Sequence, residues 1–354
     1  MTALLRTPSP SVAPPVDSLR TARRRRGRRR LTVTAVLAVL TLALLLLCLC
    51  VGNTFSRPDE VLRVLLGQTV PGASFTVGEL RLPRALTGAL AGISFGLSGV
   101  TFQTMLRNPL ASPDIIGVTA GASAAAVFAI LVLGLGGAVV SGIAVVAGLA
   151  VAASIYLLAR RGGVLGSRLI LIGIGVGAML HAVISYLLLR SSPFEVAAAL
   201  RWLTGSLNEA FWEGIPPLAI AVAALGPLLG ILSRRLHILE LGDETATSLG
   251  VNVDRTRLLL VLAAVGLAAF ATAATGPIAF VAFLAGPIAA RLIGPGGSRV
   301  LPSALLGAIL VLASDEIGQF ALGTRFPVGV VTGVLGAPYL IYLLIRTNRS
   351  GASL

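Results

Sequence analysis

Apolar segments of about 20 residues recur along the chain from Leu31 onward, and short polar stretches rich in arginine, proline and glycine separate them. An α-helix needs roughly 20 apolar residues to cross the hydrocarbon core of a bilayer. The segment at 278–291 is the shortest and fits the thickness of the bilayer least well. The pattern predicts ten membrane-spanning helices, at residues 31–51, 82–104, 113–133, 138–159, 168–189, 212–232, 257–275, 278–291, 301–320 and 328–346.

Composition supports a membrane environment. Of 354 residues, 56% are hydrophobic and 12% are charged, whereas soluble proteins carry about 25% charged residues. The chain contains 41 glycines, which in membrane helices allow neighbouring backbones to approach closely. Gly88, Gly92 and Gly96 are four residues apart and lie on one helical face, where we expect tight packing. The predicted fold class is an all-α, polytopic membrane protein.

The basic residues are all arginines, and nine of the 28 lie in the first 30 residues. The formal net charge of +14 does not indicate nucleic-acid binding, because such binding requires a folded module or aromatic residues among the charges. Residues 1–30 are rich in proline, serine and arginine and are predicted to form a disordered cytoplasmic tail that contacts anionic lipids. Residues 31–346 form the predicted transmembrane domain, and residues 347–354 a cytoplasmic C-terminal tail.

The other arginines predict the orientation of the chain. Cytoplasmic loops of membrane proteins carry an excess of lysine and arginine. With a cytoplasmic N-terminus and ten helices, 12 of the arginines after residue 30 fall in cytoplasmic segments and seven in outer segments. An odd number of helices would scramble this bias. We therefore expect a multi-pass protein of the cell (plasma or inner) membrane with both termini in the cytoplasm.

Two segments between the predicted spans are long enough to fold. Residues 53–81 lie on the outer side and include a short amphipathic stretch at Glu60–Leu66. Residues 233–257 lie on the cytoplasmic side, and Glu240–Leu249 within them is predicted to form a short polar helix.

The sequence gives little support for enzyme chemistry. A Walker A loop binds nucleotide phosphates through a lysine, and the chain has none, so ATP hydrolysis is expected on a separate partner chain. With two histidines and two cysteines, a histidine-rich metal site is excluded. No cofactor and no catalytic residue are predicted, and the chain is predicted not to be an enzyme.

Asp315 and Glu316 are the only acidic pair inside a predicted span. Carboxylates within a membrane are costly and are often functional. The pair therefore raises an alternative function, an ion-coupled secondary transporter that uses these two residues. The pair lies near the outer end of its span and has no obvious basic partner in the sequence. Hydrogen bonding between helices, or exposure at the rim, is favoured over proton coupling.

The most distinctive stretch begins at Arg81, with an Arg-x-Pro-Arg sequence, a glycine-rich span, the turn Arg107-Asn108-Pro109-Leu110-Ala111 and a new helix from Pro113. This stretch resembles the signature of the FecCD-type permeases, the membrane subunits of ABC importers for iron-siderophores, haem and vitamin B12. The similarity keeps its order and spacing across about residues 31–346. It continues in Leu241-Gly242-Asp243-Glu244-x-Ala246-x-x-Leu249-Gly250-Val251, in Gly276-Pro277-Ile278-Ala279-Phe280-Val281, and in Pro327-Val328-Gly329-Val330-Val331-Thr332 with Gly336-Ala337-Pro338.

The resemblance implies a vitamin B12/siderophore permease-like fold with ten helices per subunit. It also implies three kinds of protein partner: a second permease subunit, identical or paralogous, two ATP-binding subunits, and an extracytoplasmic substrate-binding protein. The implied function is that of a transmembrane permease in an ATP-driven, binding-protein-dependent importer, which works by alternating access between an outer and an inner gate.

The resemblance further assigns roles to residues. Arg81 and Arg84 match outer-face arginines that pair with glutamates of the binding protein, and Arg325, which lies near the same rim, is added to them. Gly166 and Ser167 match the loop before the fifth helix, which helps to close the cytoplasmic gate. The segment at about 237–251 matches the coupling helices that dock on the ATPase, with the coupling residues Leu241, Gly242, Asp243, Glu244, Ala246, Leu249 and Gly250.

Two positions depart from the family pattern. The common Pro-His-x-x-Arg sequence has no histidine here, where Pro287 is followed by Ile288 and, later, Arg291. That variant occurs among siderophore-type members and favours a ferric siderophore as the substrate. The arginine that usually follows the intramembrane aspartate is Gln319, which places one outer-face ion pair in doubt.

Overall fold

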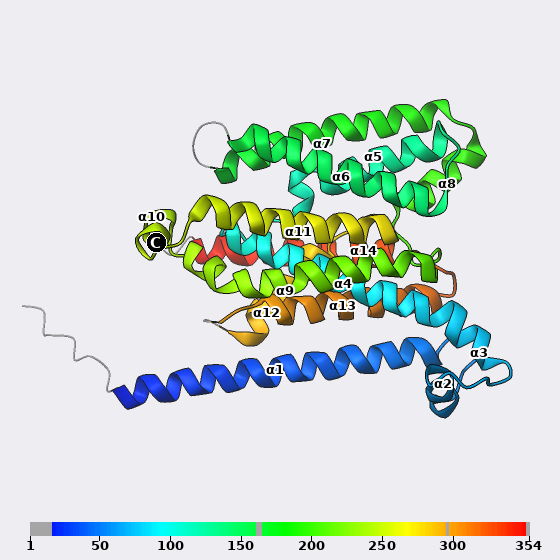
Figure 1. The fold of residues 1–354 in the computed structure, drawn as a ribbon, viewed down its shortest axis with the longest axis horizontal. Coiled ribbons are helices and arrows are strands. Elements are labelled where there is room, and N and C mark those ends of the chain that lie inside the picture. Colours follow the sequence, from blue (N-terminus) through cyan, green and yellow to red (C-terminus); the bar gives the residue numbers. More distant parts are fainter. Residues whose placement is uncertain (1–15, 161–164, 295–296, 352–354) are drawn as a thin grey trace, which may run out of the picture.

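The computed structural model describes residues 16–160, 165–294 and 297–351, and every regular element in them is helical (Figure 1), which confirms the predicted all-α fold. The long helices are α1 Val16–Cys50, α4 Leu82–Met105, α5 Val118–Leu131, α6 Gly137–Arg160, α7 Leu165–Arg190, α9 Ile215–Leu239, α11 Val253–Thr275, α12 Val281–Ile293, α13 Val300–Glu316 and α14 Val328–Gly351. Shorter helices lie between them: α2 Pro58–Leu65, α3 Ala73–Phe75, α8 Pro193–Leu203 and α10 Asp243–Ser248, the 3₁₀ turns η2 Pro113–Ile116 and η3 Trp212–Gly214, and the π-helical turns η1 Thr76–Arg81 and η4 Ile317–Ala321.

The long helices coincide with the ten predicted spans. In the described part of the chain, seven apolar helices are long enough to cross a bilayer, and α5, α12 and the apolar part of α14 are shorter. α12 has 13 residues and rises only about 20 Å. Irregular backbone at Gly276–Phe280 precedes it, and a Cβ added to Gly276 would overlap the carbonyl of Trp202. Such backbone is tolerated within membranes where protein surrounds it, so a short helix suffices here.

α4 is the central helix of the bundle and packs against α9, α11, α12 and α13 (Figure 1). The contact with α13 is backbone to backbone, because a Cβ on Gly92 would overlap the carbonyl of Gly307 and one on Gly96 would overlap the carbonyl of Ser303. Gly99 meets the carbonyl of Ala282 on α12 in the same way. The tight packing predicted for the glycines of this span is confirmed, and it leaves α4 enclosed by protein.

α1 lies along one edge of the bundle (Figure 1), and its apolar part exposes large side chains such as Leu31 and Val39. The helix begins at Val16, so residues 16–30 are helical where disorder was predicted. Arginine is among the better helix formers, and no proline interrupts the hydrogen-bond ladder that the apolar part continues. Residues 1–15 lie outside the described part of the chain.

The bundle has two distinct ends (Figure 1). The first described turn of α1, the short helix α10 and the end of α14 lie at one end, which we call the α10 end. The last turn of α1, helices α2 and α3 and the start of α4 lie at the other, which we call the α2 end. The amphipathic stretch predicted at Glu60–Leu66 is α2, and the polar helix predicted at Glu240–Leu249 is α10.

Candidate functional site

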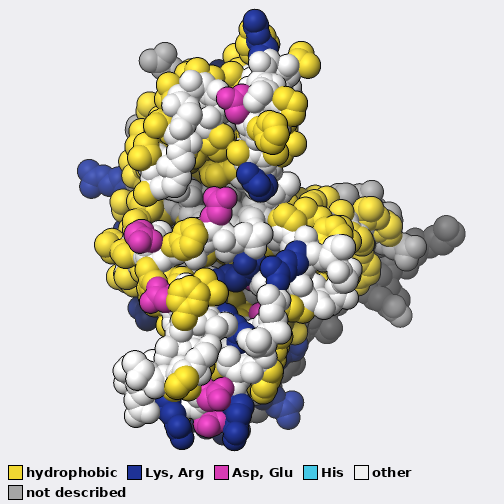
Figure 2. Space-filling view, turned by 90° about the vertical axis from the view of Figure 1, so that its right-hand side faces the viewer, with side chains coloured by type: hydrophobic (Ala, Val, Ile, Leu, Met, Phe, Trp, Pro, Cys, Tyr) yellow, Lys and Arg dark blue, Asp and Glu magenta, His cyan; other side chains and the backbone are white. Residues whose placement is uncertain are grey.

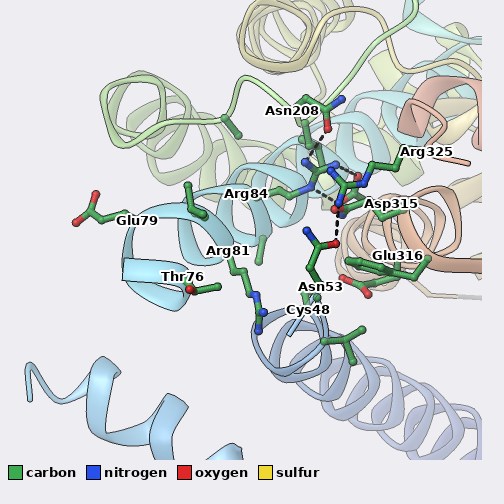
Figure 3. A pocket seen from close by; sticks show the side chains of 18 of the residues that line it. Cys48, Asn53, Thr76, Glu79, Arg81, Arg84, Asn208, Asp315, Glu316 and Arg325 are labelled. Atoms are coloured by element: carbon green, nitrogen blue, oxygen red, sulfur yellow. Dashed lines mark hydrogen bonds and ion pairs between the residues drawn. The ribbon is translucent and has the colours of Figure 1, made fainter. Parts of the chain in front are cut away.

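A pocket of about 240 Å³ lies at the α2 end. Its wall is formed by the last turn of α1, by η1 and the start of α4, by residues 207–211, and by the end of α13 with η4. Figure 2 shows this face of the molecule, with arginine and acidic side chains gathered around a hollow. The three arginines predicted to dock the binding protein, Arg81, Arg84 and Arg325, all line this pocket (Figure 3).

Arg84 is held by an ion pair inside the chain. Its Nε donates to Oδ2 of Asp315 at 2.7 Å and its Nη2 to Oδ1 at 2.7 Å, which is the bidentate geometry of a strong arginine–carboxylate pair. Nη1 donates to Asn208 Oδ1 at 2.8 Å, and Gln319 Nε2 donates to Asp315 Oδ2 at 2.8 Å. The side chain of Asp315 is 5% exposed and that of Arg84 is 20% exposed. The carboxylate thus accepts hydrogen bonds from α4 and from η4, the turn that follows α13.

This geometry corrects the expectation that the acidic pair has no basic partner. Arg84 and Asp315 are 231 positions apart in the sequence, so hydropathy and spacing alone do not show their contact. A usable signal was present, since both residues lie at the same end of their predicted spans and a buried carboxylate needs a cation. Asn208 and Gln319 complete the network and were not predicted to do so.

Arg81 closes the end of α1 instead of facing the solvent freely. Its Nη1 donates to the carbonyls of Leu49 at 2.9 Å and Cys50 at 3.0 Å, and Nη2 donates to the carbonyl of Thr54. The last carbonyls of a helix lack partners within the helix, and the guanidinium supplies them. A Cβ on Gly52 would overlap this guanidinium, so the turn after α1 is shaped around it.

Arg325 is the most accessible of the three arginines. The residue is exposed, and its Nη2 donates to Asn53 Oδ1 at 2.7 Å. No described ion pair involves its guanidinium. The roles of Arg81, Arg84 and Arg325 in docking remain predictions, but the structure distinguishes two arginines that hold the fold together from one at the rim.

The predicted coupling segment forms a compact turn at the α10 end. Gly242 has φ of 113° and Gly250 has φ of 80°, conformations that favour glycine, and they bound the six-residue helix α10. Ala246 is fully buried, whereas Leu241 is 64% exposed and Leu249 is 59% exposed. Two exposed apolar side chains thus flank a short polar helix. The coupling residues Leu241, Gly242, Asp243, Glu244, Ala246, Leu249 and Gly250 lie together on this turn.

The predicted gate residues Gly166 and Ser167 belong to the first turn of α7. Their side chains lie outside the described part of the structure, as do residues 161–164 before them. Among the described residues, no three His, Cys, Asp or Glu side chains come together in a group that could hold a metal ion.

In the described part of the chain, seven apolar helices long enough to cross a bilayer and three shorter ones form a bundle, with a charged pocket at one end and a short exposed helix at the other, which is the architecture of a multi-pass membrane protein. The model of the FecCD transport family matches residues 40–346, and the chain therefore belongs to that family.

Relatives and solved structures agree with this assignment. The chain is 40% identical to the ferric enterobactin transport system permease protein FepG of Escherichia coli over 82% of this chain and 88% of that protein. It is 38% identical to the Fe(3+)-citrate import system permease protein YfmE of Bacillus subtilis, over 83% and 89%. A structure described as an inward-facing conformation of a metal-chelate type ABC transporter superposes with a TM-score of 0.80 at 26% identity, over 89% of this chain and 99% of that one. The predicted family and fold are confirmed, and the chain is a permease component of the ABC importer type.

Proposed function

We propose that this chain is the permease subunit of an ATP-driven, binding-protein-dependent importer that carries a ferric siderophore. The observation that carries the substrate class is the match to FepG, whose name gives ferric enterobactin as its cargo, over most of both chains. The Fe(3+)-citrate permease YfmE and the achromobactin permease CbrC of Dickeya dadantii, 39% identical over 84% of this chain, support the same class. A cobalamin permease of Halobacterium salinarum at 38% identity is also similar, so the chelate is the finer part of the proposal.

The energy source is a partner chain. This sequence has no lysine and so no Walker A loop. Two ATP-binding subunits would dock at the α10 end, where Leu241 and Leu249 expose apolar area on either side of α10. A second permease subunit, identical or paralogous, would complete the pathway. Several helices expose long apolar faces, for example at Leu171, Met179 and Leu189 on α7, which lipid or that subunit would cover.

The orientation follows from the same assignment. The α10 end would face the cytoplasm, together with both termini, and the α2 end would face the extracytoplasmic side. The positive-inside bias of the arginines supports this arrangement. The binding protein would then dock over the charged pocket. Alternating access would open the chain to one side of the membrane at a time. ATP binding to the partner subunits at the α10 end and docking of the loaded binding protein at the α2 end would favour different ones of these two conformations.

The contacts of Asp315 weigh against the alternative of an ion-coupled secondary transporter that uses Asp315 and Glu316. A proton carrier must gain and release its proton during each cycle. Asp315 accepts three hydrogen bonds, two of them from the Arg84 guanidinium. The bidentate contact ties the Asp315 carboxylate to α4, which favours a structural role for Asp315.

Co-purification tests the proposal directly. The chain is expressed with the proteins encoded beside its gene and purified by a tag on this chain alone. We expect an ATPase to co-purify, a binding protein to join the complex when it is loaded with a ferric chelate, and the chelate to stimulate hydrolysis. Purification without any ATPase, together with chelate uptake by this chain alone, would contradict the proposal.

A further inference from the structure

α10 is positioned by few contacts. It has six residues, and Ala246 is the buried one among them. The glycines on either side, Gly242 and Gly250, have positive φ angles and impose no side-chain restraint. Apolar packing through one methyl group does not fix the direction of so short a helix. Its polar contacts with the bundle therefore decide how firmly it is held.

The carboxylate of Asp243, the first residue of α10, supplies those contacts. Arg257 Nη2 donates to its Oδ1 at 2.7 Å, and Arg107 Nη2 donates to the same oxygen at 3.3 Å. Arg257 lies in the second turn of α11 and is 18% exposed, and Arg107 follows the end of α4. Arg107 Nη2 also donates to the carbonyl of Leu239, the last residue of α9, at 2.9 Å. The Asp243 carboxylate thus joins α10 to α11 and to the end of α4, and the Arg107 guanidinium also joins them to the end of α9.

Arg107 has a backbone conformation that is unusual for a residue with a side chain. Its φ of 51° is left-handed, a conformation that is unfavourable for a non-glycine residue. Glycine at this position would remove the strain but also the guanidinium. Arg107 thus places a long side chain in a turn that favours glycine, and that side chain bonds to Asp243 and Leu239.

We propose that Arg107 and Arg257 are positioning residues that lock α10, through Asp243, to the central helix α4 and to α11, so that a displacement of α10 moves both helices. The inference rests on the proposed docking of an ATPase at α10. α4 has 24 residues and spans about 36 Å, and Arg84 lies at its other end, in the pocket. A rigid, enclosed α4 would carry the displacement from the α10 end to the α2 end.

Amide hydrogen exchange tests the lock without any partner chain. In the purified full-length chain, Asp243→Asn should accelerate exchange in residues 243–248 about fivefold, because partly exposed ion pairs contribute up to roughly 1 kcal/mol. Asp254→Asn is the matched control, since Asp254 is exposed at the start of α11 and makes no described ion pair. Equal exchange in Asp243→Asn and the unmodified chain would overturn the proposal.

Transport per ATP tests the transmission in the complete importer. Arg107→Gln and Arg257→Gln should keep the ATPase subunits at unchanged stoichiometry but lower transported chelate per ATP at least fivefold, and Arg255→Gln, an exposed neighbour, should leave the ratio unchanged. An unchanged ratio in both single variants, or loss of the ATPase with an unchanged ratio in the remaining complexes, overturns the proposal. If the unmodified complex shows no ATP-dependent uptake, the proposed function itself fails.

Discussion

The two oxygens of Asp315 on α13 receive two parallel hydrogen bonds of 2.7 Å from the guanidinium of Arg84 on α4. The same two helices meet backbone to backbone further along, at Gly92 and Gly307. The ion pair holds the two helices together at the α2 end, and the close glycine contact holds them together within the bundle. Together these contacts define the register of the central helix against its most extensive neighbour.

The ion pair predicts a marked loss of stability when one partner is removed. Asp315→Ala leaves the Arg84 guanidinium partly buried without its counter-charge, which costs about 3 kcal/mol. The double variant Arg84→Met with Asp315→Leu should cost less than Asp315→Ala, because it removes both charges. Thermal unfolding in detergent measures the effect, with Glu79→Gln, an exposed acid of the pocket rim, as the control. A double variant less stable than Asp315→Ala would show that the charges themselves are required.

The glycine contact predicts a sharp difference between two similar substitutions. Gly92→Ala places a methyl group on the carbonyl of Gly307 and must separate α4 from α13, so we expect a loss of several kcal/mol and poor accumulation of the protein. Gly142→Ala on α6 meets open space and should be neutral or slightly stabilising. Expression level and unfolding temperature compare the two variants. Similar behaviour of both would show that α4 and α13 can separate without cost.

Two arginines of the pocket should differ in what their substitution changes: Arg81 the stability of the chain, and Arg325 the docking of the binding protein. Arg81→Gln removes the guanidinium donor of the Leu49 carbonyl and leaves the Cys50 carbonyl with the Ser56 N–H alone, which costs about 1–3 kcal/mol. Arg325→Glu lies at the exposed rim and should change stability by less than about 0.5 kcal/mol, but weaken binding-protein docking about tenfold. Unfolding temperature and a binding titration with the loaded binding protein measure the two effects. Unchanged docking affinity in Arg325→Glu would remove Arg325 from the docking surface.

A capping box predicts pH dependence at the start of α8. The Ser192 hydroxyl donates to Glu195 Oε2 at 2.8 Å and its backbone N–H donates at 3.0 Å, and these bonds lower the pKa of Glu195 below its usual 4.5. A lowered folded-state pKa gives stability that is present above pH 4.5 and lost as the pH falls through the lowered value. The protection of amides in residues 193–199, taken relative to their intrinsic exchange rate at each pH, should therefore fall on acidification. Glu195→Gln should remove this dependence, and a persisting dependence would assign it to another group.

The sequence predicts the spans well because lipid imposes length and hydropathy on each helix independently of its neighbours. α2 was also predicted, because its polar and apolar residues fall at helical spacing, and α10 was predicted as a short polar helix. α8 was missed although its Ser192-Pro193-x-Glu195 sequence is a capping box with proline at the first helical position. The helical state of residues 16–30 was missed because composition was weighed without helix propensity.

The charged contacts were less accessible to prediction. Arg84 meets Asp315, and Arg107 meets Asp243, only because the fold brings distant helix ends together. A family resemblance identifies positions with a role, but it does not show which of them a chain satisfies internally. Arg81 illustrates the difference. An arginine at this position is compatible both with docking of the binding protein and with hydrogen bonding to the last carbonyls of α1.

Uptake into proteoliposomes tests the central claim most directly. The chain is reconstituted with its ATPase and a loaded binding protein, so that the α2 end faces the chelate. We predict that the ferric chelate accumulates only when ATP is present on the ATPase side, and that uptake survives dissipation of the proton gradient. Accumulation driven by a proton gradient in vesicles that contain this chain alone, without an ATPase, would contradict the account.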